Sequence, residues 1–200
     1  SDNGNLTEVL RNLAASDFIR ISCFYGKKIK DAKYHLSDYY PAFYFLFIRD
    51  QYGKDEHFWM HANDHPARRA WAGLTFEQLC LDHLAQIKKR LGISGVLTEE
   101  SVWYTRGDST LNIPGEQIDL VISRRDRVIH LCEMKFSMNE FTVDKEYEAS
   151  LRNKIAAFQR FCGARETLLL TLITTYGVRE NMYSGIVHSQ VALDDLFETS

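Results

Sequence analysis

Two neighbouring apolar runs carry charged side chains of the types that can bind a metal ion. Asp119 lies inside the first run, and Glu133 and Lys135 lie inside the second. Strand side chains alternate between faces, so Glu133 and Lys135 share one face at a spacing of roughly 7 Å. If the two runs pair as a hairpin, Asp119 reaches the same face. Two carboxylates and a lysine at one sheet edge suit a divalent cation and an activated water.

A solvated sheet face with cross-strand ion pairs is the alternative interpretation of the same residues. The residues around them are strongly apolar, which favours central strands over half-exposed ones. Charged side chains are rarely placed in such strands without a partner or a metal. The apolar context therefore lowers the weight of the alternative without removing it.

The residues before these runs predict a helix over 73–91. Its apolar positions repeat at helical spacing, and Gly92 suits the position after a helix end. Thr75 and Gln78 match a capping box, which predicts a helix start just before them. Glu77 would then lie in the first turn, where a carboxylate stabilises the helix N-terminus.

The residues after the two runs complete an alternation of strands and helices. A second helix is predicted over 140–162, and the continuous apolar run 167–174 predicts a strand buried on both faces. A weaker strand is predicted over 185–191, and a short helix over 194–197. With a strand at 102–105, the predicted order is helix, three strands, helix, two strands.

The N-terminal part has a different character. A helix over 6–15 is followed by two short predicted strands, 17–21 and 32–36, which enclose a basic tip containing Lys27, Lys28 and Lys30. These lysines either contact phosphates or form a solvated hairpin tip. The aromatic run 43–48 is interpreted as core rather than as a platform for stacking bases, because it has no interleaved basic residues.

Asp119 followed by Glu133-Met134-Lys135 resembles the PD-(D/E)XK nuclease motif. The preceding Gly115-x-Gln117-Ile118-Asp119 is similar to a form of the motif in which Ile118 replaces the usual proline. The order of predicted elements is also similar to that of this family. The resemblance implies an α/β fold with a restriction-endonuclease-like αβββαβ core and a central mixed sheet over 73–200.

The resemblance also implies roles for individual residues. Asp119 and Glu133 would ligate Mg²⁺ or Mn²⁺, with the main-chain carbonyl between Glu133 and Lys135 as a possible third ligand. Lys135 would orient or help deprotonate the attacking water. Glu77 would be an outer or second-metal ligand, and Gln117 would support the site. The implied reaction is hydrolysis of phosphodiester bonds in DNA.

The N-terminal residues resemble the last helix and wing of a winged-helix domain, over 1–40. Residues 36–48 are similar to a stretch of archaeal-type P-loop ATPases, in which a winged helix precedes a C-terminal PD-(D/E)XK-like domain. We therefore expect 1–40 to be a partial winged helix and 41–72 a helical connector. The chain would be the C-terminal part of such an ATPase, and it has no Walker A pattern of its own.

Two rival interpretations remain open. The domain could be a catalytically silent module that docks DNA or regulates or oligomerises the ATPase, or a partner-binding module of a defence or toxin system. An intact set of Asp119, Glu133 and Lys135 favours the enzyme.

Composition limits the remaining possibilities. The chain has 200 residues with 45% hydrophobic content, enough for one good core and a smaller satellite. Its net charge of −3 argues against strong nonspecific DNA affinity. The four cysteines form no CxxC pair, which is typical of free thiols in a reducing compartment. With no signal peptide and no apolar run long enough to span a bilayer, we expect a cytoplasmic protein without a membrane partner.

Overall fold

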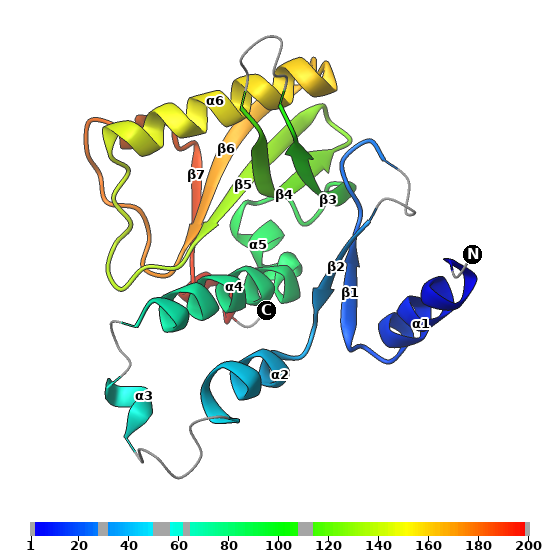
Figure 1. Cartoon of the computed structure of the whole chain (residues 1–200). Coiled ribbons are helices and arrows are strands. Elements are labelled where there is room, and N and C mark those ends of the chain that lie inside the picture. The colour runs from blue at the N-terminus through cyan, green and yellow to red at the C-terminus, as the bar shows by residue number, and fades with distance from the viewer. Residues whose placement is uncertain (1–2, 28–31, 50–56, 62–64, 108–113, 199–200) are drawn as a thin grey trace.

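A five-stranded mixed sheet forms the centre of the protein (Figure 1). The computed structural model describes residues 3–27, 32–49, 57–61, 65–107 and 114–198. β3, β4 and β5 run antiparallel, and β5, β6 and β7 run parallel. The prediction of an α/β chain with a central mixed sheet is confirmed. In spatial order the strands are β3 (Thr98–Thr105), β4 (Glu116–Arg124), β5 (Val128–Lys135), β6 (Thr167–Thr174) and β7 (Ser189–Ala192).

The two charged runs pair as the predicted hairpin, β4 with β5. The register runs from Ser123 opposite Ile129 to Leu120 opposite Cys132. On its other side β4 pairs with β3, and there the register shifts between Ser101 and Trp103. Three residue steps on β4 are matched by two on β3, so the extra residue of this β-bulge lies on β4, at Asp119 or its neighbour. Bulges redirect side chains and are enriched beside active sites.

Helices cover both faces of the sheet (Figure 1). α6 (Lys145–Cys162) lies across one face, where Phe158 packs with Trp103 and Val121. α4 (Pro66–Asp82) and α5 (Leu84–Arg90) cover the other face, where Cys80 packs among sheet residues such as Cys132. The helix predicted over 140–162 therefore exists but begins later, at Lys145.

The helix predicted over 73–91 differs from the structure at its start. α4 begins at Pro66, and His65 caps it by accepting a hydrogen bond from the Ala67 N–H. The predicted capping box is wrong, because Thr75 lies inside the helix and Gln78 donates to the Ser37 carbonyl. The predicted single helix is interrupted at His83, which ends α4 and precedes α5.

Gly92 follows α5 with φ of +69°, as expected at a helix end. Glu77 lies well inside α4 rather than in its first turn, so stabilisation of the helix N-terminus does not explain it.

The N-terminal segment forms a ribbon that closes one edge of the sheet. α1 (Asn3–Ala15) precedes the antiparallel pair β1 (Ile19–Ser22) and β2 (Lys33–Leu36). After β1 the chain bonds to the outer side of β3, where the Tyr25 N–H donates to the Val102 carbonyl and the Val102 N–H donates to the Cys23 carbonyl. Unpaired sheet edges invite aggregation, and this segment covers one.

The aromatic run packs as predicted in part. α2 (Tyr39–Phe43) continues into the π-helix η2 (Tyr44–Ile48), and α3 (Phe58–His61) follows. Phe43 and Phe47 contact Trp59 and Trp71 with ring centroids 5.2–6.0 Å apart, whereas Phe45 is 57% exposed. The run is thus partly core and partly surface.

The C-terminal region is less strand-like than predicted. Residues Ser184–Ile186 form the 3-10 helix η3, so only Ser189–Ala192 of the predicted 185–191 strand pairs with the sheet. The predicted short terminal helix is the 3-10 helix η4 (Asp194–Leu196).

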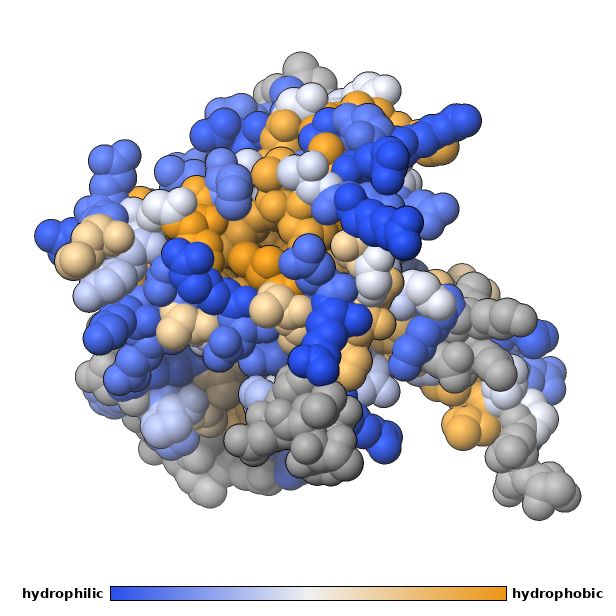
Figure 2. Space-filling model, turned by 90° about the horizontal axis from the view of Figure 1, so that it is seen from above, coloured by the Kyte–Doolittle hydropathy of each residue, from blue (hydrophilic) through white to orange (hydrophobic). Residues whose placement is uncertain are grey.

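The surface is mixed in polarity. Seen from above the view of Figure 1, apolar side chains gather in a shallow hollow in the middle of the face, with hydrophilic side chains around them (Figure 2). Among the described residues, no helix is both long enough and apolar enough to cross a membrane. The four cysteines are free thiols.

Candidate metal centre

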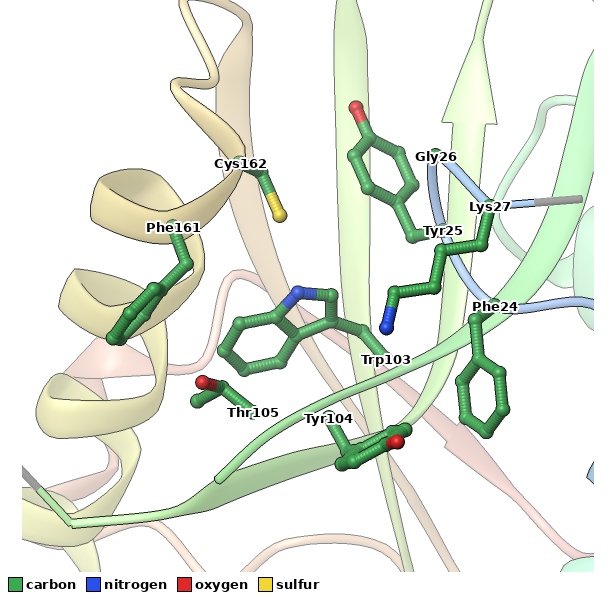
Figure 3. A pocket seen from close by; sticks show the side chains of 9 residues that line it. All are labelled: Phe24, Tyr25, Gly26, Lys27, Trp103, Tyr104, Thr105, Phe161 and Cys162. Atoms are coloured by element: carbon green, nitrogen blue, oxygen red, sulfur yellow. The ribbon is translucent and has the colours of Figure 1, made fainter. Parts of the chain in front are cut away.

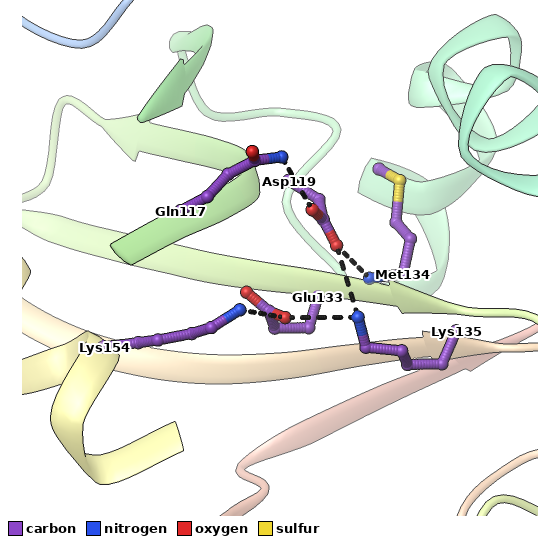
Figure 4. Close-up of polar contacts among 6 residues, drawn as sticks. All are labelled: Gln117, Asp119, Glu133, Met134, Lys135 and Lys154. Atoms are coloured by element: carbon purple, nitrogen blue, oxygen red, sulfur yellow. Dashed lines mark hydrogen bonds and ion pairs between the residues drawn. The ribbon is translucent and has the colours of Figure 1, made fainter. Parts of the chain in front are cut away.

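Glu133 is the most deeply buried charged residue of the site, with 1% of its surface exposed. Its Oε2 accepts a hydrogen bond of 2.6 Å from Lys154 Nζ, which reaches it from α6 (Figure 4). Its Oε1 is also buried but has no hydrogen-bond partner within the described residues. Burial, and then the charge of Asp119, raise the pKa of Glu133 to about 7 even though Lys154 and Lys135 oppose the shift.

Asp119 takes the place of a main-chain partner at the end of the hairpin. The β4–β5 register stops at Leu120 opposite Cys132. One step further, the Met134 N–H donates to Asp119 Oδ2 at 3.0 Å (Figure 4). The bulge in β4, which lies opposite β3, thus coincides with the point where the Asp119 carboxylate enters the gap between β4 and β5. Gln117 Nε2 lies 3.4 Å from the other oxygen, Oδ1, at the limit of a hydrogen bond.

Lys135 joins the two carboxylates. Its Nζ lies 3.6 Å from Glu133 Oε2 and 4.0 Å from Asp119 Oδ2 (Figure 4). The Lys135 ammonium also lies over the Tyr147 ring, 5.9 Å from its centroid. At 32% exposure the Lys135 side chain reaches solvent, whereas both carboxylates are largely covered. The structure therefore brings Asp119, Glu133 and Lys135 together at one end of the sheet.

Glu77 contributes charge from α4, which covers the face of the sheet opposite α6 (Figure 1). It is half-buried on α4, and burial followed by the charge of Asp119 raises its pKa, against the effect of Lys33, Lys135 and Lys154. Among the described residues, no three His, Cys, Asp or Glu side chains are arranged as a ready metal site. Glu77 is therefore coupled to the pair electrostatically without completing a three-residue ligand set.

The donor set fits a hard divalent cation. Asp119 and Glu133 offer only oxygen ligands, and Mg²⁺ is commonly held by one or two carboxylates together with waters and substrate phosphates. Glu133 Oε1, which has no partner in the part of the chain that the structure describes, is an acceptor that a cation would satisfy. Burial first, and then the charge of Asp119, raise the pKa values of both Glu77 and Glu133.

Lys154 is the site residue that the sequence analysis missed. It lies on the apolar face of α6 with Leu151 and Phe158, three and four positions away. A lysine among apolar positions of a predicted helix is a signal that could have identified it. Its partner, Glu133, lies on a different element, so spacing alone did not reveal the contact.

Of the three lysines predicted to contact nucleic acid, one lies among the described residues. Lys27 is exposed, and its ammonium lies 5.3 Å from the Tyr104 ring centroid and 5.8 Å from that of Phe24. Lys28 and Lys30 fall outside the described residues. His65 caps α4, and the rings of His57 and His61 lie 6.3 Å apart.

Comparison with known proteins adds little to this geometry. No protein-family model matches the chain, and no curated protein does. A solved structure of a protein of unknown function, AF1548, is similar at 16% identity with a TM-score of 0.40. The match covers 59% of this chain and 64% of that one. A likeness of this size assigns neither a family nor a function.

Proposed function

We propose that the chain is a metal-dependent nuclease domain that hydrolyses phosphodiester bonds in DNA. The observation that carries the proposal is the convergence of two carboxylates on Lys135 Nζ at a bulged sheet end, with a buried carboxylate oxygen that has no partner among the described residues. The order α4–α5, β3, β4, β5, α6, β6 supports a restriction-endonuclease-like core. The helix and ribbon α1–β1–β2 support the partial winged helix, again as a proposal.

Asp119 and Glu133 would hold Mg²⁺ or Mn²⁺, with Glu77 acting through water as an outer ligand. The ion supplies Lewis-acid stabilisation of charge on the phosphate and lowers the pKa of water. Lys154 and the Met134 N–H each occupy one oxygen of a carboxylate, which fixes the orientation of the other oxygen.

Lys135 is placed to orient the attacking water. Its ammonium stands between the two carboxylates and is open to solvent, so it can hold a water and face a phosphate oxygen at the same time. Lys154 is less exposed and is committed to Glu133, so it acts as a positioning residue. The two lysines therefore have separate roles.

Cleavage assays with matched variants test this proposal. Wild-type protein should nick plasmid DNA in Mg²⁺ or Mn²⁺ and not in EDTA. Lys135→Ala should lower the rate at least about a hundredfold, the usual scale for losing a group that handles the proton, while still binding metal. Asp119→Ala should lose both cleavage and metal. Lys145→Ala, which changes an exposed lysine at the start of α6, is the control and should cleave normally. Equal cleavage by all four proteins would indicate a contaminating nuclease and remove support for the site.

A second candidate function is a silent DNA-docking or regulatory module of a larger ATPase. The Glu133–Lys154 pair at 2.6 Å favours it, because a lysine can take the place of a cation beside a buried carboxylate. The two functions differ in metal binding, which only the nuclease requires.

A further inference from the structure

A cavity of about 420 Å³ opens where the N-terminal segment crosses the outer edge of β3 (Figure 3). Its walls come from three parts of the chain: the segment after β1, the end of β3 and the last turn of α6. Most of the lining side chains are aromatic, and one is a lysine. The main ones are Phe24, Tyr25, Lys27, Trp103, Tyr104 and Phe161.

The far wall of this cavity is closely packed. Trp103 is buried and packs against Phe158 of α6, with ring centroids 5.3 Å apart. Tyr25 packs against the same ring at 5.0 Å. The main-chain hydrogen bonds of Val102 with Tyr25 and Cys23 hold the N-terminal segment in place. A ligand would therefore meet a preformed surface, which lowers the entropic cost of binding.

The mouth of the cavity is apolar but exposed to solvent. Tyr104 is 38% exposed and Phe161 is 42% exposed, and they lie on different elements on either side of the opening (Figure 3). Aromatic rings in such a position offer flat faces to a planar group, and a nucleobase gains binding energy from stacking whatever its identity. The Lys27 ammonium points into the same space, where Figure 3 shows it between Trp103 and the Phe24–Tyr104 pair.

The cavity is linked to the candidate metal centre through one strand pair. Tyr104 on β3 lies directly opposite Gln117 on β4, and Gln117 contacts the Asp119 carboxylate. Neighbouring strands lie about 4.8 Å apart. A nucleic-acid strand with one phosphate at the metal centre would thus have a neighbouring nucleotide within reach of the cavity.

We propose that this cavity binds an unpaired base of a nucleic-acid strand, stacked on Tyr104 and Phe161, with Lys27 contacting the adjacent phosphate. The proposal rests on the nuclease function and deepens it, because it assigns single-stranded or locally unpaired substrate to the site. A base inside a duplex has both faces covered by its neighbours, so intact double helix cannot fill the cavity. A lysine beside aromatic walls matches the combination of phosphate and base in one nucleotide.

Binding is tested without metal, so that the outcome does not depend on cleavage. Fluorescence anisotropy of a labelled ten-nucleotide single-stranded DNA in EDTA should give roughly tenfold weaker binding for Tyr104→Ala and for Phe161→Ala, the scale of one lost stacking contact. Tyr104→Phe, which keeps the ring, should bind within about twofold of wild type. Lys27→Gln should reduce the salt slope by about 0.7, the value for one phosphate contact on a single strand. Tyr40→Ala, at a tyrosine that is 59% exposed elsewhere, is the control.

The outcomes separate this proposal from the nuclease proposal. Unchanged binding by both alanine variants, or equal binding of single-stranded and duplex DNA, would overturn the cavity proposal even if the protein cleaves DNA. Adenosine monophosphate binding more tightly than the strand would also overturn it, in favour of a free nucleotide ligand. Loss of binding in Phe161→Ala with unchanged melting temperature would support it, whatever the cleavage assays show.

Discussion

At the scale of one residue, Glu133 is a carboxylate whose burial lowers the stability of the fold. A carboxylate with 1% exposure is costly to ionise, and its pKa is raised to about 7 although an ammonium lies 2.6 Å away. An apolar residue in the middle of β5 would avoid this cost. Glu133, whose Oε1 has no hydrogen-bond partner among the described residues, is therefore better explained by a ligand than by packing.

His35 gives a test of pH dependence away from the metal centre. Burial, followed by the charges of Lys33 and Arg20, lowers its pKa from 6.5 to about 4. Because the folded state disfavours the protonated ring, the stability that neutral His35 contributes to the fold is fully present above pH 6.5. This contribution is lost as the pH falls towards 4.

The expected loss from His35 is on the order of 1 kcal/mol, reduced from the full value because the ring is only partly buried. Urea denaturation at pH 7.5 and pH 4.5 measures this loss. His35→Gln should show a smaller loss of unfolding free energy between the two pH values than wild type. An equal loss in both proteins would contradict the assignment.

At the scale of elements, the end of the β3–β4 pair positions both candidate sites. Gly115 lies just before β4, and a Cβ built there would be 2.9 Å from the Thr105 carbonyl oxygen of β3. This contact involves main chain, which cannot move aside as a side chain can. The close approach therefore requires glycine at this position.

Replacing Gly115 by alanine should destabilise the fold by roughly 1–3 kcal/mol, because the two strands must separate. Gly95→Ala is a matched control, since a Cβ there has no neighbour within 4 Å among the described atoms. Thermal unfolding of both variants measures the difference. If both melt at the wild-type temperature, the close approach of β3 and β4 has no energetic consequence.

The strands could be predicted from the sequence better than the helix boundaries. The apolar run 167–174 is buried as β6, as expected of a strand inside a parallel sheet. The start of α4 was missed because His65 caps it and Trp71 holds its first turns in the aromatic cluster. His65 is an unusual cap, and the aromatic contacts join separate segments.

Periodicity also could not reveal the bulge at Asp119 or the contact of Lys154 with Glu133. Both depend on how neighbouring elements meet rather than on local spacing. The carboxylates and Lys135 could be identified from the sequence because all three lie on one predicted hairpin.

At the scale of the whole molecule, the N-terminal ribbon is joined to the sheet domain at two places. Residues 23–25 extend the edge of β3, and Arg20 and Tyr39 both contact Asp82 of α4. The segment after β1 thereby forms one wall of the aromatic cavity, at the same end of the β3–β4 pair as the Asp119 carboxylate. With a net charge of −3, the chain has little general attraction for nucleic acid, so binding has to come from such local features.

Metal binding tests the central claim most directly. Isothermal titration of the protein with Mg²⁺ and Mn²⁺ at pH 8, where Glu133 with a pKa of about 7 is largely ionised, should show an ion bound at millimolar concentration or below. Asp119→Asn and Glu133→Gln should abolish this binding. Asp126→Asn, at the exposed turn at the far end of the same hairpin, should leave it unchanged. No heat of binding in the wild-type protein, or equal binding in Asp119→Asn, would contradict a metal centre formed by these two carboxylates.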